Sequence, residues 1–284
     1  MVSHSQPPTG LGRRRRRLSD EETEQRMLRT AAAMVNRTGL TVSLDHIGLE
    51  DVIRDADVSR SAVYRRWPYK DLFISDLVKQ LAKTATPTIV EDELAMIRRI
   101  AADHLDWLET SELRHGLVME LFRQLSLLDF QTLYESAGWR TYLALHATFM
   151  SLADGELRDQ VGAALAESER EHRARVARAW ELLAGLLGYR LRPDAGVTFD
   201  IVATLLDAAI RGLVIMALST PDIATRRVEA RPAGAVTRDE WSLPALGLAG
   251  VASAFLEADP AVEWDSERIA RAGRALNGLT LPRE

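Results

Sequence analysis

The chain has 284 residues, 46% of them hydrophobic and 27% charged, which is typical of a globular protein with one or two domains and excludes wholesale disorder. It contains no cysteine, which excludes disulfides, thiolate zinc sites and cysteine nucleophiles. The net charge of −5 is divided unevenly, since residues 1–84 carry 15 basic and 11 acidic side chains and the remainder carries 21 and 30. A basic first part before an acidic second part is typical of a DNA-binding protein with a separate regulatory domain.

Residues 1–18 predict a disordered basic arm, because a stretch rich in Pro, Gly and Ser is followed by the arginines 13–17. Such an arm could enter a minor groove, or it could be a solvated tail that adds salt-sensitive, nonspecific attraction. We favour the tail, because five identical charges define no register. No apolar stretch follows the arginines, so we expect no secretory signal and a cytoplasmic protein.

Four helices are expected in residues 19–84. The first begins at Ser19, which forms a capping box with Glu22, and ends near Gly39. The others are predicted at about 49–56, 59–67 and 70–84, and Pro68 ends the third. A domain boundary is expected at 84–88, around Pro87.

Residues 88–284 show helical periodicity almost throughout, and no convincing run of period two indicates a strand. The expected fold class is therefore all-α. Residues 220–242 contain Pro221, Pro232 and Gly234 and predict a long, mobile loop. Helices are expected at about 90–109, 112–128, 130–152, 155–187, 198–218, 243–257 and 267–276.

The segment 49–73 has the pattern of two short helices that cross closely. Ala56 is small enough for the crossing, and Asp57 tolerates a left-handed backbone in the turn. Val58 would fill the inside of the turn, and Ser59 would cap the second helix. Val63 and Trp67 lie four residues apart and should face inward.

The opposite face of that second helix is polar and basic. Short polar groups and guanidinium groups near a helix N-terminus can contact base edges in a major groove, while tyrosine and lysine suit phosphate oxygens. The alternative without DNA binding is a polar helix hairpin from some other fold. We favour a DNA interface because the cap, crossing, turn and inward residues agree in one register. Its candidate residues are Ser59, Arg60, Ser61, Ala62, Tyr64, Arg65, Arg66, Tyr69 and Lys70.

Over about residues 19–84 the chain closely resembles the tetracycline-repressor family of transcriptional regulators, and beyond them only in helix number and order. The resemblance implies a three-helix, helix-turn-helix DNA-binding head, a fourth connecting helix, and a C-terminal helical bundle for ligand binding and dimerisation. By that resemblance Arg60, Ser61 and Ala62 lie near bases, and Tyr64, Arg66 and Lys70 lie near the DNA backbone.

The chain departs from the family pattern at several positions. Asp57 stands in place of the usual glycine, and Ala62 replaces a common threonine, so one contact to DNA is expected to be lost. Arg66 and Trp67 replace a more usual Tyr/His-Phe pair. The stretch 39–48 is longer than usual, which leaves the loop before the second helix undefined.

The predicted helices 155–187 and 198–218 are candidates for a homodimer interface. The second is apolar nearly all round, so it needs burial on several sides. Asp200, Asp207 and Arg211 argue against a membrane span. The resemblance implies that these two helices pair with their mates, and a palindromic DNA site needs two heads. An ordinary monomer core is the alternative.

A small apolar ligand could bind between the helices, although aromatic residues at this spacing are more often core. The charged run 169–175 is expected to be a solvated helix face. We expect no metal site, because none of His104, His115 and His146 forms an i, i+4 pair with another histidine. The weak ligand candidates are Trp107, Met119, Phe122, Trp139, His146, Phe149 and Trp180.

These features predict a ligand-responsive repressor that binds a palindromic operator in double-stranded DNA as a homodimer. No phosphate loop, nucleophile elbow or dinucleotide fingerprint is present, so neither an enzyme nor a cofactor is expected. One alternative is an all-helical enzyme or small-molecule carrier with a vestigial DNA-binding head. Another is a chromatin protein that coats DNA without sequence choice, against which the acidic second part counts.

Overall fold

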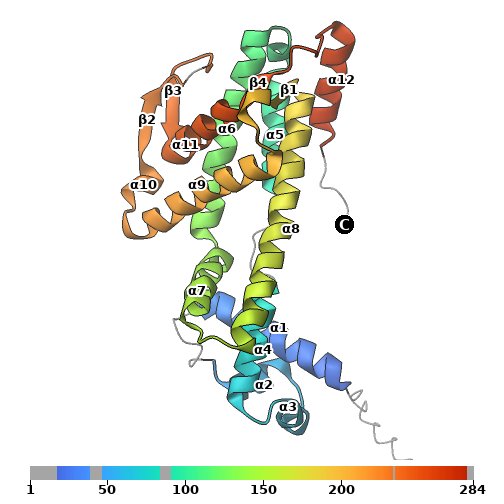
Figure 1. Cartoon of the computed structure of the whole chain (residues 1–284), viewed down its shortest axis with the longest axis vertical. Helices are drawn as coiled ribbons and strands as arrows, with labels where there is room; N and C mark the ends of the chain where they lie inside the picture. The colour runs from blue at the N-terminus through green and yellow to red at the C-terminus, as the bar shows by residue number, and fades with distance from the viewer. Residues whose placement is uncertain (1–17, 39–46, 84–90, 233, 280–284) are drawn as a thin grey trace, which may run out of the picture. The chain divides into compact units, whose positions relative to one another are not determined.

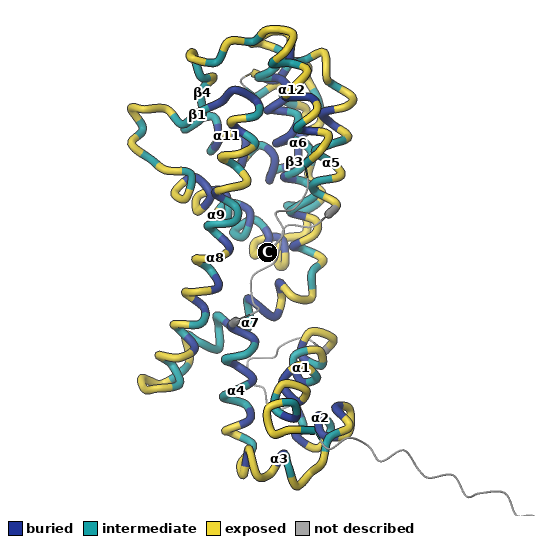
Figure 2. Tube along the Cα trace, turned by 90° about the vertical axis from the view of Figure 1, so that its right-hand side faces the viewer, coloured by how far each residue is buried: buried dark blue, intermediate teal, exposed yellow. Residues whose placement is uncertain are grey.

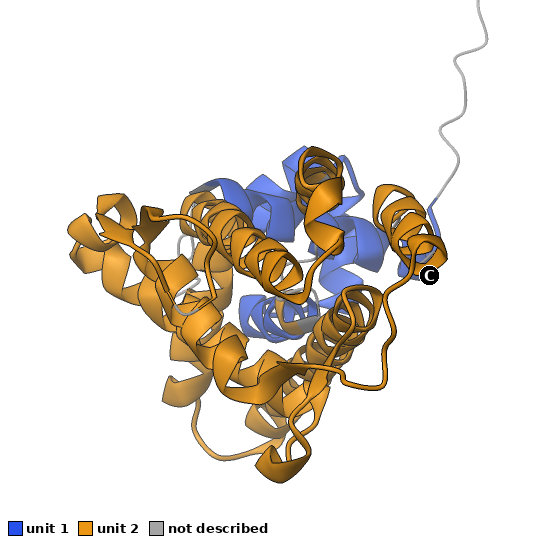
Figure 3. Ribbon diagram, turned by 90° about the horizontal axis from the view of Figure 1, so that it is seen from above, with its two compact units in different colours: residues 1–80 blue, residues 81–284 orange. Residues whose placement is uncertain are grey.

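The computed structural model describes residues 18–38, 47–83, 91–232 and 234–279. The chain divides into two compact units, residues 1–80 (unit 1) and residues 81–284 (unit 2), which are coloured separately in Figure 3. Both units are mostly helical, as expected from the sequence. The predicted arm, the longer stretch after Gly39 and the predicted boundary at 84–88 lie wholly or largely outside the described residues.

Unit 1 contains α1 (Asp20–Thr38), α2 (Leu49–Ala56), α3 (Arg60–Arg66) and most of α4 (Lys70–Lys83). The predicted capping box starts α1: the Ser19 N–H donates to Glu22 at 2.7 Å, and the Glu22 N–H donates to Ser19 Oγ at 3.0 Å. Helix α1 packs against α2 and α3. Buried and exposed residues alternate along these helices (Figure 2), and the apolar side chains that form the core include Met27, Ala31, Val35, Val52, Val63, Trp67, Phe73 and Leu77.

Unit 2 is built around α6 (Ser111–Glu135), α8 (Glu156–Leu186), α9 (Phe199–Ser219) and α11 (Leu243–Phe255). Helix α11 packs against both α6 and α9, and α9 packs against α8 (Figure 1). One hydrophobic core runs through these contacts. The other helices are α5 (Glu91–Asp103), η2 (Leu105–Leu108), α7 (Ala137–Ser151), η3 (Pro193–Ala195), α10 (Asp222–Thr225) and α12 (Ser266–Asn277).

The predicted break near residue 129 is wrong, because α6 continues to Glu135. Asp129 interrupts the apolar periodicity, but it does not end a helix. The helix ends at Ser136, whose Oγ accepts a hydrogen bond from the Trp139 N–H at 3.1 Å and so caps α7. The sequence therefore placed the boundary between these two helices too early.

The expected loop at 220–242 is also wrong. Helix α10 is followed by an antiparallel hairpin of β2 (Arg227–Ala230) and β3 (Asp239–Ser242), in which Val228 pairs with Trp241. Trp241 is almost fully buried. A second antiparallel pair joins β1 (Tyr189–Leu191) to β4 (Leu256–Ala258). Strands of three or four residues are too short to show an alternating pattern in the sequence.

Helix α9 is long and apolar enough to cross a bilayer by length and composition alone, a test that buried core helices also pass. One side of it is buried in unit 2, through Val202, Leu206, Ile210 and Val214. The opposite side exposes large apolar side chains, namely Ile201, Leu205, Ile215, Met216 and Leu218. The single chain therefore covers only part of the apolar surface of this helix.

Candidate nucleic-acid interface

The turn between α2 and α3 has the predicted left-handed residue. Asp57 has φ 52° and ψ 49°, and its N–H donates to the Arg54 carbonyl at 3.2 Å. The Val58 N–H donates to the Ile53 carbonyl at 3.4 Å. Ala56, at the predicted crossing, is buried. These backbone bonds end α2 and direct the chain into α3 within three residues.

Ser59 occupies the N-cap position of α3, but the predicted side-chain cap does not form. Its hydroxyl lies 2.8 Å from Ser61 Oγ, whereas the Ala62 and Val63 N–H groups donate to the Ser59 carbonyl. The neighbouring serine competes for the hydroxyl that would otherwise accept from the backbone. Two exposed hydroxyls therefore lie at the start of α3.

The inward face of α3 is as predicted. Val63 and Trp67 expose none of their surface. The Trp67 ring packs edge-on against Phe73 at a centroid distance of 5.1 Å, and its indole N–H donates to Asp76 Oδ2 at 2.9 Å. Because the ring is both packed and hydrogen-bonded, the rotation of α3 about its own axis is fixed.

The outward face carries the remaining candidates. The Arg60 side chain is 72% exposed, and Tyr64 and Tyr69 are 44% and 73% exposed. Ser61 and Arg65 are exposed as well, while Ala62 and Lys70 are half-buried. The structure thus leaves the polar candidates of α3 exposed, while its core residues Val63 and Trp67 are buried.

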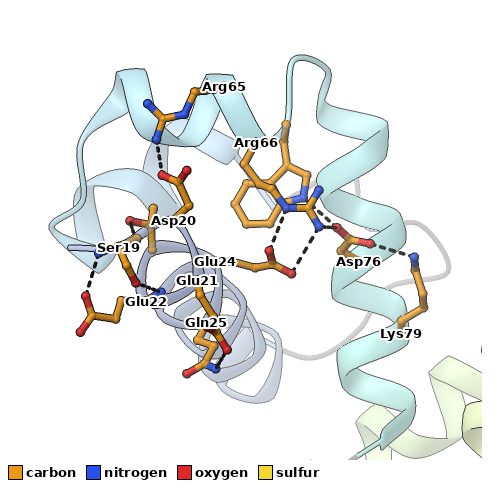
Figure 4. A network of polar contacts seen from close by, with 12 residues as sticks. Ser19, Asp20, Glu21, Glu22, Glu24, Gln25, Arg65, Arg66, Asp76 and Lys79 are labelled. Carbon is orange, nitrogen blue, oxygen red and sulfur yellow. Dashed lines mark hydrogen bonds and ion pairs between the residues drawn. The ribbon is translucent and has the colours of Figure 1, made fainter.

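Acidic side chains of unit 1 pair with this outward face. Glu50 of α2 contacts two residues of α3, since its Oε2 lies 2.5 Å from Arg60 Nη2 and its Oε1 accepts from the Tyr64 hydroxyl at 2.7 Å. The hydrogen bond to Glu50 raises the pKa of Tyr64, and burial adds to that effect. Arg65 forms an ion pair with Asp20 of α1 (Figure 4). Each arginine is thus oriented by a neighbouring helix.

Arg66, which was expected to contact the DNA backbone, instead binds two carboxylates of unit 1. Its Nε donates to Glu24 of α1 at 2.8 Å, and its Nη2 donates to Asp76 of α4 at 3.1 Å (Figure 4). Asp76 also pairs with Lys79 at 2.8 Å. Burial raises the pKa of Asp76, but hydrogen bonds from Lys79 and Trp67, together with the charges of Lys79 and Arg66, outweigh it and hold the pKa below its ordinary value. Arg66 therefore links three helices of unit 1.

Sequence reasoning missed Glu50, Asp20, Glu24 and Asp76. Helical spacing relates residues within one helix, whereas these partners lie on other helices, 9 to 45 positions away from the residues that they bind. The one available signal was the excess of carboxylates in the first turns of α1 and α2. That pattern is also what the helix dipole favours, so it does not identify a partner.

The seven ligand candidates do not form one pocket. Trp107 and Met119 line a small cavity beneath the β2–β3 hairpin, which Trp241 also lines. Phe122 and Trp180, stacked at a centroid distance of 4.9 Å, line a second, apolar cavity between α6 and α8. The other three are on α7: Trp139 and His146 contact Tyr142, and Phe149 packs against Arg158.

A partly buried ionic cluster occupies the contact between α8 and α9. Arg211 donates to Glu169 at 2.9 Å and lies 3.4 Å from Asp207, which in turn lies 3.0 Å from His172 Nε2. The run 169–175 is therefore not simply a solvated face, because Asp207 and Arg211 of α9 pair with two of its side chains. Asp129 of α6 lies near this cluster: burial, with the nearby charge of Asp207, raises the pKa of Asp129 to about 6.

The three histidines considered as metal ligands have other contacts. His115 Nδ1 lies 2.7 Å from the Tyr189 hydroxyl, His146 Nδ1 lies 3.0 Å from the Tyr142 carbonyl, and His104 packs against Trp107. In the part of the chain that the structure describes, no three acidic or histidine side chains converge in a way that could hold a metal ion.

No protein-family model matches the chain, and no curated protein matches it. An assignment of function therefore depends on the chemistry and placement of the chain's own residues.

Proposed function

We propose that the chain is a sequence-specific DNA-binding transcriptional regulator of the tetracycline-repressor kind, which acts as a homodimer on a palindromic site. One observation carries the proposal. Helix α3 buries Val63 and Trp67 completely while its Arg60, Ser61 and Tyr64 side chains are exposed. An arginine, a hydroxyl and a phenol on one exposed helical face are the groups that contact DNA bases and phosphates.

In this proposal α3 enters the major groove. Arg60 and Ser61 lie in its first turn, from which they would contact base edges, and an arginine contacts guanine O6 and N7 most often. Tyr69 and Lys70 follow α3 and would contact phosphates, which fix the register of the protein on the duplex. Arg66 would contribute charge near the DNA while it remains bound to Glu24 and Asp76.

The exposed apolar side of α9 supports a dimer. Ile215, Met216 and Leu218 lie 45–55% exposed, and Leu182 of α8 is 55% exposed. Helices α8 and α9 pack against each other, so these side chains belong to neighbouring helices of one unit. Large exposed apolar side chains on one helix are typical of interfaces between protein chains. A two-fold axis beside α9 would pair α8 and α9 with their mates.

The proposed regulation is release from DNA by a small apolar ligand that binds unit 2. The cavity between α6 and α8 is lined by apolar side chains that include Phe122, Trp180 and Leu183. A ligand that binds one conformer of unit 2 more tightly shifts the population toward it. Repression relieved by ligand is the expected direction.

The decisive experiment is selection of bound duplexes from a random pool by the purified full-length chain. A palindromic consensus, bound roughly a thousandfold more tightly than random DNA, is the expected result. The variant R60A/Y64A should lose this preference. The matched control is R54A, which removes an exposed arginine from α2 rather than from α3.

Two results would overturn the proposal. One is the absence of any enriched sequence, which would favour a carrier or an enzyme. The other is equal enrichment by the wild type and by R60A/Y64A. The dimer is tested separately by I215E/M216E, which should sediment as a monomer, with M150E as the control because Met150 is exposed on α7. A dimer that survives I215E/M216E would exclude this interface.

A further inference from the structure

Glu50 occupies an unusual position for an acidic residue in a proposed DNA interface. It lies in the first turn of α2, and both of its carboxylate oxygens are directed to α3. Oε2 contacts the Arg60 guanidinium at 2.5 Å, and Oε1 accepts from the Tyr64 hydroxyl at 2.7 Å. One carboxylate thus contacts two of the three side chains on which the proposed interface depends.

Glu50, Arg60 and Tyr64 form this contact at the surface of the protein. Arg60 and Tyr64 are four positions apart, so they lie on the same side of α3, one above the other. Glu50 remains 47% exposed and Arg60 72% exposed, so the group is at the surface and not in the core. A negative charge at such a surface opposes the approach of phosphate groups.

The geometry of the arginine side chain indicates what the negative charge of Glu50 does. An arginine has five N–H donors in a rigid fork, and the contact with Glu50 is made by one terminal nitrogen. The fork can therefore bind a carboxylate and a guanine edge together. An arginine that is already oriented loses less conformational freedom when it binds. Tyr64, bound to the same carboxylate, is oriented with it.

We propose that Glu50 is a positioning residue for sequence recognition: it orients Arg60 and Tyr64 toward a base pair and weakens binding to unrelated DNA. The inference rests on the proposed function of α3. A phosphate of unrelated DNA would have to displace the Glu50 carboxylate from Arg60. A correctly placed guanine would instead accept hydrogen bonds from the other N–H groups of Arg60, and the Glu50 carboxylate would stay bound. Glu50 therefore acts mainly on the ratio of specific to nonspecific affinity.

The test compares E50Q with D51N on the duplex selected by the wild type and on random duplex. Both variants remove one negative charge from the first turn of α2, but Asp51 pairs with Arg54 of its own helix. We expect E50Q to bind random DNA several-fold more tightly and to lose about tenfold of the specificity ratio, the discrimination of one bidentate base contact. D51N should increase both affinities alike and leave the ratio unchanged.

The background R60A separates positioning from a structural role. If Glu50 acts through Arg60, then E50Q should change the specificity ratio much less in R60A than in the wild type. A second selection with E50Q should show a weaker preference at one base pair of each half-site. Thermal unfolding of each variant establishes that it is folded.

The outcomes distinguish this inference from the function on which it rests. A wild-type chain that enriches no sequence overturns the proposed function, and the role of Glu50 with it. A wild-type chain that enriches a consensus, with equal specificity ratios for E50Q and D51N, overturns the role of Glu50 alone. An equal effect of E50Q with and without Arg60 does so too.

Discussion

The two units use their charged residues differently. In unit 1 the pair of Arg60 and Glu50 lies at the surface, with 72% and 47% of the side chains exposed. In unit 2 the pair of Arg211 and Asp207 is enclosed, with 16% and 19% exposed. An exposed pair contributes about 0–1 kcal/mol and can exchange one partner for another, whereas loss of one member of a buried pair costs about 3–5 kcal/mol. The charges of unit 1 are therefore suited to binding, and those of unit 2 to maintaining the fold.

The largest effect is expected from R211A. This change leaves Glu169 and Asp207 without their cation and removes the guanidinium that packs over Trp139 and Tyr142. The free energy of unfolding should fall by about 3–5 kcal/mol. Urea denaturation followed by circular dichroism measures it. The control R60A should leave the unfolding midpoint nearly unchanged, and similar losses in the two variants would refute the contrast between the units.

The next effect concerns Glu93 of α5. Burial, with the charges of Asp129 and Asp92, raises the pKa of Glu93 to about 8. The folded chain therefore binds this proton more tightly than the unfolded chain does, and its stability falls as the pH rises from about 4.5 to about 8. In E93Q this fall should be absent. Relative to the wild type, E93Q should gain ~1–3 kcal/mol between about pH 4 and about pH 9.

Thermal unfolding across that pH range, in one buffer series of constant ionic strength, measures the difference. D103N is the control, because Asp103 is exposed on the same helix and is not among the charges that raise the pKa of Glu93. A wild-type profile parallel to that of E93Q would show that Glu93 is not enclosed as described.

Arg66 is intermediate between Arg60 and Arg211, because its side chain is 44% exposed and yet contacts two other helices. The change R66A removes its bonds to Glu24 and Asp76, and it should destabilise the chain by about 1 kcal/mol. That loss should be smaller than the loss for R211A and larger than the loss for R60A. Urea midpoints of the three variants, measured together, give the order, and a loss for R66A equal to that for R211A would contradict it.

The smallest effect is expected at Asp57, whose φ of 52° lies in the left-handed region. Glycine adopts this conformation without the steric cost of a Cβ, so D57G should stabilise the chain by about 0.5–1 kcal/mol. D57A keeps the Cβ and lacks the polar group, so it should not be stabilising. Differential scanning calorimetry compares the two, and a lower unfolding temperature for D57G would mean that the aspartate side chain stabilises the turn.

Much of unit 1 could be predicted because its signals are local. The Ser19 capping box, the left-handed Asp57 and the inward pair Val63 and Trp67 each depend on residues a few positions apart. Unit 2 was predicted less completely. The continuous α6 and the β2–β3 hairpin were both missed, because periodicity within one segment does not record contacts with distant segments, such as the pairing of Val228 with Trp241.

The sequence alone determined where most of the helices lie and which of their faces are apolar, since both follow from periodicity and capping along one segment. Only the tertiary structure decided which groups meet across helices: Glu50 with Arg60 and Tyr64, and Arg211 with Glu169 and Asp207. The physical reason is that such contacts depend on how helices pack, and residue spacing within one helix does not record that packing.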